Sequence, residues 1–119
     1  MTDLPVAEST APPKGLAELA DLDAVFSALA HQSRRTILSV LQARGGEMTS
    51  GAIAARFEHS WPTISAHLRV LEKAGLVTIA MRGRERVYRL DTGHLHEIAG
   101  GWLARFPPPN HQETRSQSP

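Results

Sequence analysis

The apolar residues of this chain recur at the three- and four-residue spacing of helices in five segments, and two short extended runs lie between the fourth and the fifth. The predicted helices span about residues 16–29, 32–44, 50–57, 60–75 and 92–106, and the extended runs span 76–81 and 85–90. Thr49 or Ser50 is expected to cap the third helix, and Asp91 or Thr92 the last. In the first helix, the apolar pattern is made by Leu22, Val25, Phe26 and Leu29. The residues expected to face inward from the second and third helices are Ile37, Leu38, Leu41, Ile53, Ala54 and Phe57.

The fourth predicted helix has one apolar and one polar face. Ile64, Leu68 and Leu71 follow an i, i+4, i+7 pattern and are expected to face inward. Ser60 is the expected N-cap. Small residues near the start of the opposite face would allow close approach to base edges, and cations farther along could reach bases or phosphates. This outward face is predicted to consist of Pro62, Ser65, Ala66, Arg69 and Lys73.

The positive charge of the chain is concentrated in this helix and the hairpin after it. Residues 60–90 contain six basic and two acidic residues, a net charge of +4, whereas the whole chain carries +1. Arg82-Gly83-Arg84 is expected to join the two strands, and Arg82, Arg84 and Arg86 to contact the DNA backbone or the minor groove. Two short helices joined near Glu58-His59 would form a helix-turn-helix, so the pattern indicates a DNA-binding face. The alternative is an amphipathic helix and hairpin whose charges only keep the surface solvated.

Composition limits the classes of protein that remain. The 119 residues predict one domain, with 41% hydrophobic and 21% charged residues typical of a globular chain. The absence of cysteine excludes disulfides and thiolate metal sites. The chain contains no apolar run of about 18 residues, so no membrane span is predicted. The N-terminus does not have the pattern of a secretory signal, and a cytoplasmic location is therefore expected. The chain has no nucleophile–base–acid set at meaningful spacing and no glycine-rich phosphate loop, so no enzyme is expected.

The two ends of the chain are polar or rich in proline. Residues 1–15 are expected to form a disordered N-terminal arm and residues 107–119 a disordered C-terminal tail, which leaves residues 16–106 as the folded domain. A fold of about 90 residues has a modest core, and burial of further apolar surface in a dimer would stabilise it.

The last predicted helix has a wide apolar stripe, made of Leu95, Ile98, Ala99, Trp102, Leu103 and Phe106. This stripe could dock on the core of its own domain or form a dimer interface together with the first helix. We favour the dimer, because one thin layer of helices cannot easily bury two such faces. The expected interface residues are Leu22, Val25, Phe26, Leu95, Ile98, Trp102, Leu103 and Phe106.

Four sequence blocks together resemble the ArsR-type winged-helix transcriptional repressors, namely FSALAHQSRRTIL, ARF, SWPTISAHLRVLEKAGLV and RGRERVYRL. The resemblance runs from Phe26 to about Phe106. It implies a mainly α winged helix-turn-helix homodimer: four helices, a small β-hairpin and a fifth helix, with the first and last helices at the dimer interface. It also implies that double-stranded operator DNA upstream of a small gene cluster is the target. By position, it puts Ser60, Trp61, Thr63, Ser65 and Ala66 at the start of the recognition helix.

This chain departs from the family pattern at three places. Family members commonly have Gln at the position of Trp61 and His at that of Ala66, so the set of base-reading residues differs. They often have Asp-Pro in place of His31-Gln32, and the loss of that N-cap should cost the second helix on the order of 1 kcal/mol.

His67 lies beside the inward stripe of the fourth helix and is expected to be a packing residue.

Many members of this family sense a metal ion, but this chain has few residues that could bind one at the corresponding positions. The third helix lacks a Cys-x-Cys pair, and a zinc site between the last helices would need its second half near Arg105 and Pro108, which cannot coordinate zinc. We therefore expect no metal and no cofactor, as in the metal-free branch of the family, with an unidentified small-molecule effector left open. Two alternatives remain, a zinc-responsive repressor that uses Asp91 and His94, and a winged-helix protein-interaction module suggested by exposed Trp61 and Trp102.

Overall fold

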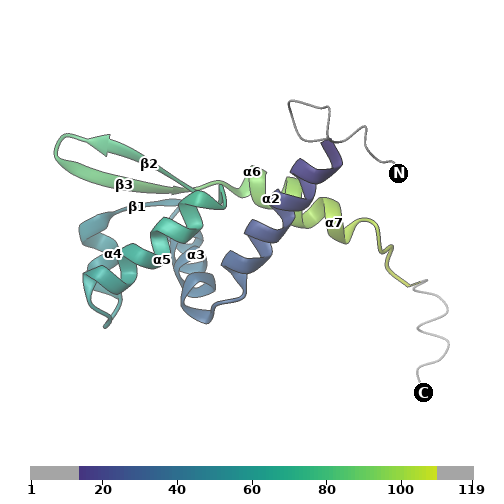
Figure 1. Ribbon diagram of the computed structural model, residues 1–119. Coiled ribbons are helices and arrows are strands. Elements are labelled where there is room, and N and C mark those ends of the chain that lie inside the picture. Colours follow the sequence, from purple (N-terminus) through teal and green to yellow (C-terminus); the bar gives the residue numbers. More distant parts are fainter. Residues whose placement is uncertain (1–13, 110–119) are drawn as a thin grey trace, which may run out of the picture.

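The computed structural model describes residues 14–109 and has the predicted winged helix-turn-helix architecture, mainly helical with a small antiparallel sheet (Figure 1). Helices α3, α4 and α5 lie on one side of the sheet, and the hairpin formed by β2 and β3 extends beyond them as the wing. The elements in chain order are α2 (Lys14–Leu29), α3 (Gln32–Ala43), β1 (Glu47–Thr49), α4 (Ser50–Arg56), α5 (Trp61–Lys73), β2 (Val77–Arg82), β3 (Glu85–Leu90), α6 (Thr92–Leu95), the π-helix η1 (His96–Gly100) and α7 (Gly101–Leu103).

The first helix begins slightly earlier than the sequence predicted. Helix α2 starts at Lys14, two residues before the expected domain boundary. Residues 1–13 and 110–119 lie outside the described residues, so the predicted arm and most of the predicted tail stay predictions. No helix among residues 14–109 is long and apolar enough to cross a membrane.

Helix α3 agrees with the prediction on its inner face and differs at its cap. Ile37, Leu38 and Leu41 are buried, as expected from their spacing. The expectation that His31 leaves this helix uncapped is wrong, because the Nδ1 atom of His31 accepts a hydrogen bond from the backbone N–H of Ser33 at 3.3 Å. An imidazole nitrogen thus takes the place of the oxygen usual at an N-cap.

A third strand, β1, was not predicted. The sheet order is β1-β3-β2, and both pairs are antiparallel, with Met48 opposite Tyr88. Thr49 ends this strand and also caps α4, since its hydroxyl oxygen accepts a hydrogen bond from the N–H of Ala52 at 3.1 Å. A strand of three residues between a glycine pair and a helix cap has too little periodicity to be read from sequence. In α4, Ile53 is buried as predicted, but Ala54 is exposed.

The wing has a tighter turn than predicted. Arg82 pairs with Glu85 in the ladder, so only Gly83 and Arg84 form the turn instead of Arg82 to Arg84. Gly83 has a φ of 66°, and a positive φ at the first turn residue alone is the pattern of a type II′ hairpin turn. The side chain of Arg82 therefore starts from a strand and not from the tip.

The core lies between the sheet and helices α3, α4 and α5, with α2 adding two residues. Tyr88, Leu71 and Leu76 are among its largest fully buried side chains. Val25 from α2 is 0% exposed and belongs to this core. The prediction of Val25 as a dimer contact is therefore wrong, because no part of its side chain is left for a partner to touch.

The predicted last helix is divided and shorter. It begins as expected, with the Oδ1 atom of Asp91 accepting from the N–H of His94 at 2.9 Å. It then widens into the π-helix η1 and ends at Leu103 instead of Phe106. Pro107 disfavours a helical conformation for the residue before it, and the N–H of Phe106 already bonds to the carbonyl of Leu103 at 3.0 Å, one residue short of helical spacing.

Candidate nucleic-acid interface

The outer face of α5 is uncovered, while its inner face anchors the helix. Ile64, Leu68 and Leu71 are each 1% exposed or less, as predicted from their spacing. On the opposite side no element of residues 14–109 packs over the predicted DNA-facing residues. Pro62, Thr63, Ala66, Arg69 and Lys73 are exposed, and Ser65 is half-buried. The outer face of α5 is therefore accessible in the described part of the chain.

Two hydroxyl groups are arranged at the start of this helix. Ser60 is the N-cap residue, as predicted, but its side chain makes no bond to the helix backbone. Its Oγ atom instead lies 3.2 Å from the Oγ1 atom of Thr63, and both side chains are exposed. Each hydroxyl keeps further capacity to donate or accept, which is what contact with a base edge or a phosphate requires.

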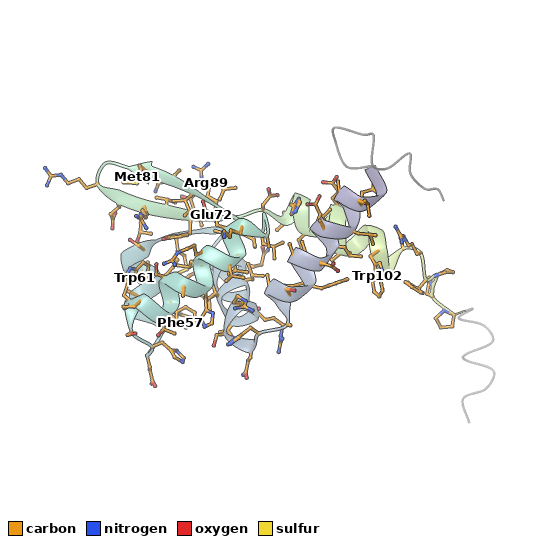
Figure 2. The ribbon with its side chains drawn as sticks, viewed as in Figure 1. Phe57, Trp61, Glu72, Met81, Arg89 and Trp102 are labelled. Carbon is orange, nitrogen blue, oxygen red and sulfur yellow. The ribbon has the colours of Figure 1, made fainter. Side chains whose placement is uncertain are left out.

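Trp61 lies differently from what the sequence suggested. It is half-buried and packs, like Phe57, against the core at the beginning of α5 (Figure 2). The expectation of an exposed Trp61 is thus wrong, because the first turn of α5 turns the indole toward its own domain. One of the two observations behind the protein-interaction alternative is thereby removed.

Glu47 on β1 pairs with an arginine on each of the two other strands of the sheet, and it is a residue that the sequence did not single out. Its Oε2 atom accepts from Arg82 Nη2 at 2.8 Å, and its Oε1 atom accepts from Arg89 Nε at 3.0 Å. The hydrogen bond from Arg82, together with the charges of Arg82 and Arg89, holds the pKa of the Glu47 carboxyl below its ordinary value of 4.5. The carboxylate is therefore ionised at neutral pH and partly compensates both arginines.

The cations of the wing consequently fall into two groups. Arg82 is engaged by Glu47, although it was predicted as a DNA contact equal to the others. Arg84 and Arg86 are exposed, and the two ion pairs found among residues 14–109 both belong to Glu47. A phosphate would compete with a carboxylate for Arg82 but not for Arg84.

A second surface lies at the end of the domain away from the tip of the wing, where α2 and α7 meet (Figure 1). The ring of Phe26 meets that of Trp102 edge-on at 5.2 Å, and Trp102 lies 4.8 Å from Phe106. Next to these rings is a groove of about 450 Å³, lined in part by Leu19, Leu22, Ile98 and Trp102. Of the predicted interface residues, Phe26, Trp102, Leu103 and Phe106 are exposed, and Leu22, Leu95 and Ile98 are half-buried. Leu16 and Leu19 on α2 are exposed as well.

The residues weighed for zinc have structural partners. Asp91 caps α6, and the ring of His94 packs so closely on Gly75 that a Cβ added there would lie 2.8 Å from it. No group of three or more His, Cys, Asp or Glu side chains within residues 14–109 could hold a metal ion.

Two short helices with an uncovered second helix, followed by a cationic hairpin, define a winged helix-turn-helix protein of the DNA-binding type. A helix-turn-helix domain family matches residues 29–80. The chain is 38% identical over 82 residues to the transcriptional repressor SdpR of Bacillus subtilis, covering 69% of this chain and 88% of that protein.

Solved structures agree with this relationship. An ArsR-like transcriptional regulator from Rhodococcus is 31% identical with a TM-score of 0.62, covering 75% of this chain and 89% of that one. The homodimeric winged helix-turn-helix DNA-binding domain of a possible ArsR-family regulator from Mycobacterium bovis is 27% identical with a TM-score of 0.63, covering 87% of this chain and 94% of that one. The chain belongs to the ArsR family of winged helix-turn-helix transcriptional regulators.

Proposed function

We propose that this protein is a homodimeric repressor that binds a roughly palindromic operator, with one α5 helix in the major groove of each half-site. The observation that carries the proposal is the exposed outer face of α5 beside the cations of the wing. Two comparisons add support, since SdpR is named a repressor and the Mycobacterium bovis domain is described as a homodimer that binds DNA.

The side chains of α5 and its N-cap residue are assigned to bases or to phosphates according to their length and chemistry. Ser60, Thr63 and Ser65 are short and carry hydroxyls, so they read base edges where the helix lies deepest. Ala66 adds a methyl group suited to contact with a thymine methyl. Arg69 reaches a base or a phosphate, and Lys73 reaches a phosphate near the end of the helix. Arg84 and Arg86 hold the backbone or the minor groove beside the half-site.

Self-association follows from the apolar surface of α2 and α7. Leu16, Leu19 and Leu103 are each more than half exposed, and the ring of Phe26 on α2 contacts that of Trp102 on α7. A second copy applied with two-fold symmetry would cover this surface and fill part of the groove next to it. The two α5 helices would then face the same side of the duplex, about 34 Å apart.

Selection of bound fragments from a genomic library tests the proposal. We expect enrichment of fragments near promoters with an inverted repeat, and fluorescence anisotropy should give saturable binding that weakens steeply with salt. Absence of saturable, salt-sensitive binding to any fragment would refute it and would favour the protein-interaction alternative.

The two arginines at the wing are predicted to behave differently. Arg84→Ala should weaken binding to all sequences and reduce the slope of log K against log salt by roughly one contact, because a free cation is lost. Arg82→Ala should have the smaller effect, because Glu47 already compensates that arginine. Salt titrations by anisotropy on specific and random duplexes measure both slopes. An unchanged slope in Arg84→Ala would contradict the assignment of the wing.

A further inference from the structure

Arg34 connects the last turn of α2 with the middle of α5. Its Nε atom donates to the carbonyl of Ala28 at 2.8 Å, and its Nη2 atom donates to the carbonyl of Ser27 at 3.1 Å. Its Nη1 atom lies 3.4 Å from the Nδ1 atom of His67 on α5. A guanidinium cannot accept a hydrogen bond, so Nδ1 of His67 must be the acceptor and must carry no proton. One side chain thus joins the helix of the proposed dimer interface to the recognition helix.

The surroundings of His67 oppose its protonation. The side chain is half-buried, and its ring lies 4.6 Å from the ring of His31, the residue that caps α3. Burial lowers the pKa of His67 below its ordinary value of 6.5, and the charges of His31, Arg34 and His59 lower it further. These groups face it from the start of α3, from α3 itself and from the α4–α5 loop, and α2 contributes the carbonyls held by Arg34.

A proton on Nδ1 would turn an acceptor into a donor that points at a guanidinium. The contact with Arg34 would be lost, and two neighbouring cations would repel each other. Helix α5 would then lose its polar link through Arg34 to α2, and only the packing of Ile64, Leu68 and Leu71 in the core would set its angle.

We propose that Arg34 and His67 are a positioning pair that sets the angle of the recognition helix relative to the dimer interface, and that binding to the operator requires His67 to be neutral and therefore weakens in acid. This inference rests on the proposed function, because the angle matters when two helices must meet two half-sites about 34 Å apart. The affinity for random duplex depends much less on that angle, because such DNA is bound mainly through phosphate contacts.

The sign of the pH effect separates this device from ordinary electrostatics. A group whose pKa is lowered in the paired arrangement stabilises it above the ordinary value of 6.5, and this contribution is lost as the pH falls below 6.5. Protonated histidines near a phosphate backbone act in the opposite direction, since added positive charge strengthens binding in acid.

The test compares the full-length protein with His67→Asn, His67→Ala and the control His96→Asn, which removes an exposed histidine from the π-helix η1. The Oδ1 atom of Asn can accept from Arg34 but does not titrate. Affinity for a selected operator fragment and for random duplex is measured at about pH 7.5 and about pH 5.5 at constant ionic strength. We expect the wild type and His96→Asn to lose roughly tenfold in operator affinity relative to His67→Asn on acidification, and His67→Ala to be weak at both pH values.

Equal pH responses of the wild type and His67→Asn would overturn the inference while leaving the proposed function intact. No binding by the wild type at any pH would instead refute the proposed function. If the substituted proteins fail to fold, an NMR titration of the His67 ring in the wild type decides. We expect the pKa of this ring to fall when operator DNA binds, whereas a rise would show that phosphate attraction dominates and would overturn the inference.

Discussion

Leu103→Asp is expected to make the protein monomeric and to weaken operator binding by roughly 100-fold, about 2.7 kcal/mol. Leu103 is the last residue of α7 and its side chain is 63% exposed, so an aspartate costs little in the isolated protomer. In the proposed dimer the same carboxylate would be buried without a partner on each side of the two-fold axis, which costs several kcal/mol. Sedimentation equilibrium measures the association, and anisotropy on a palindromic fragment measures the affinity.

Two controls separate dimerisation from stability and charge. Leu103→Met keeps an apolar side chain of similar volume and should remain dimeric. Gln42→Glu adds one negative charge on the exposed side of α3 and should change neither association nor affinity by more than a few-fold. A Leu103→Asp protein that stays dimeric would show that the dimer interface does not include the surface of α2 and α7 around Leu103.

Ala66→Glu is expected to abolish binding to operator and random duplex alike, with a loss of roughly 100-fold or more at low salt. Ala66 is exposed on the outer face of α5, where a carboxylate would meet the negative field of the groove. The fold should persist, because substitution at an exposed helix position usually changes stability by less than about 0.5 kcal/mol. Gel shift and anisotropy measure the binding, and thermal unfolding by circular dichroism measures the stability.

Ala66→Gln is the matched control, since Gln has the size and shape of Glu without the charge. It should lose much less affinity for random duplex and should change the preference among operator variants, because its amide can pair with adenine in place of a methyl contact with thymine. Wild-type affinity of Ala66→Glu for both duplexes would mean that α5 does not enter the groove, and the proposed function would fail.

Several features followed correctly from local sequence patterns. The three-residue inward stripes of α3 and α5, the caps at Thr49 and Asp91, and the Gly-containing turn of the wing each depend on residues within a few positions of one another. Helical periodicity and turn chemistry act at that range, so the order of the first four helices and the hairpin, and the outer face of α5, could be predicted, whereas the three-residue strand β1 could not.

Local patterns did not assign contacts that packing creates. Val25 fits the same apolar stripe as Phe26, yet one is fully buried and the other is exposed, because the neighbours of α2 on each side decide their environment. The turn from α4 into α5 directs Trp61 toward the core. The π-helix from His96 to Gly100 changes the direction in which the following side chains point relative to a regular α-helix. Apart from Val25, the site residues for DNA and for the partner protomer stay predictions that the substitutions above address.

The sequence by itself determined that this is a winged helix-turn-helix chain with a cationic wing and an amphipathic recognition helix. Hydrophobic periodicity, helix caps and local charge each depend on residues that are only a few positions apart. Only the tertiary structure decided that Glu47 holds Arg82 and Arg89 from positions 35 and 42 residues away, and that Arg34 meets His67 from 33 residues away. Such pairs depend on how whole elements pack, and no spacing along the chain encodes them.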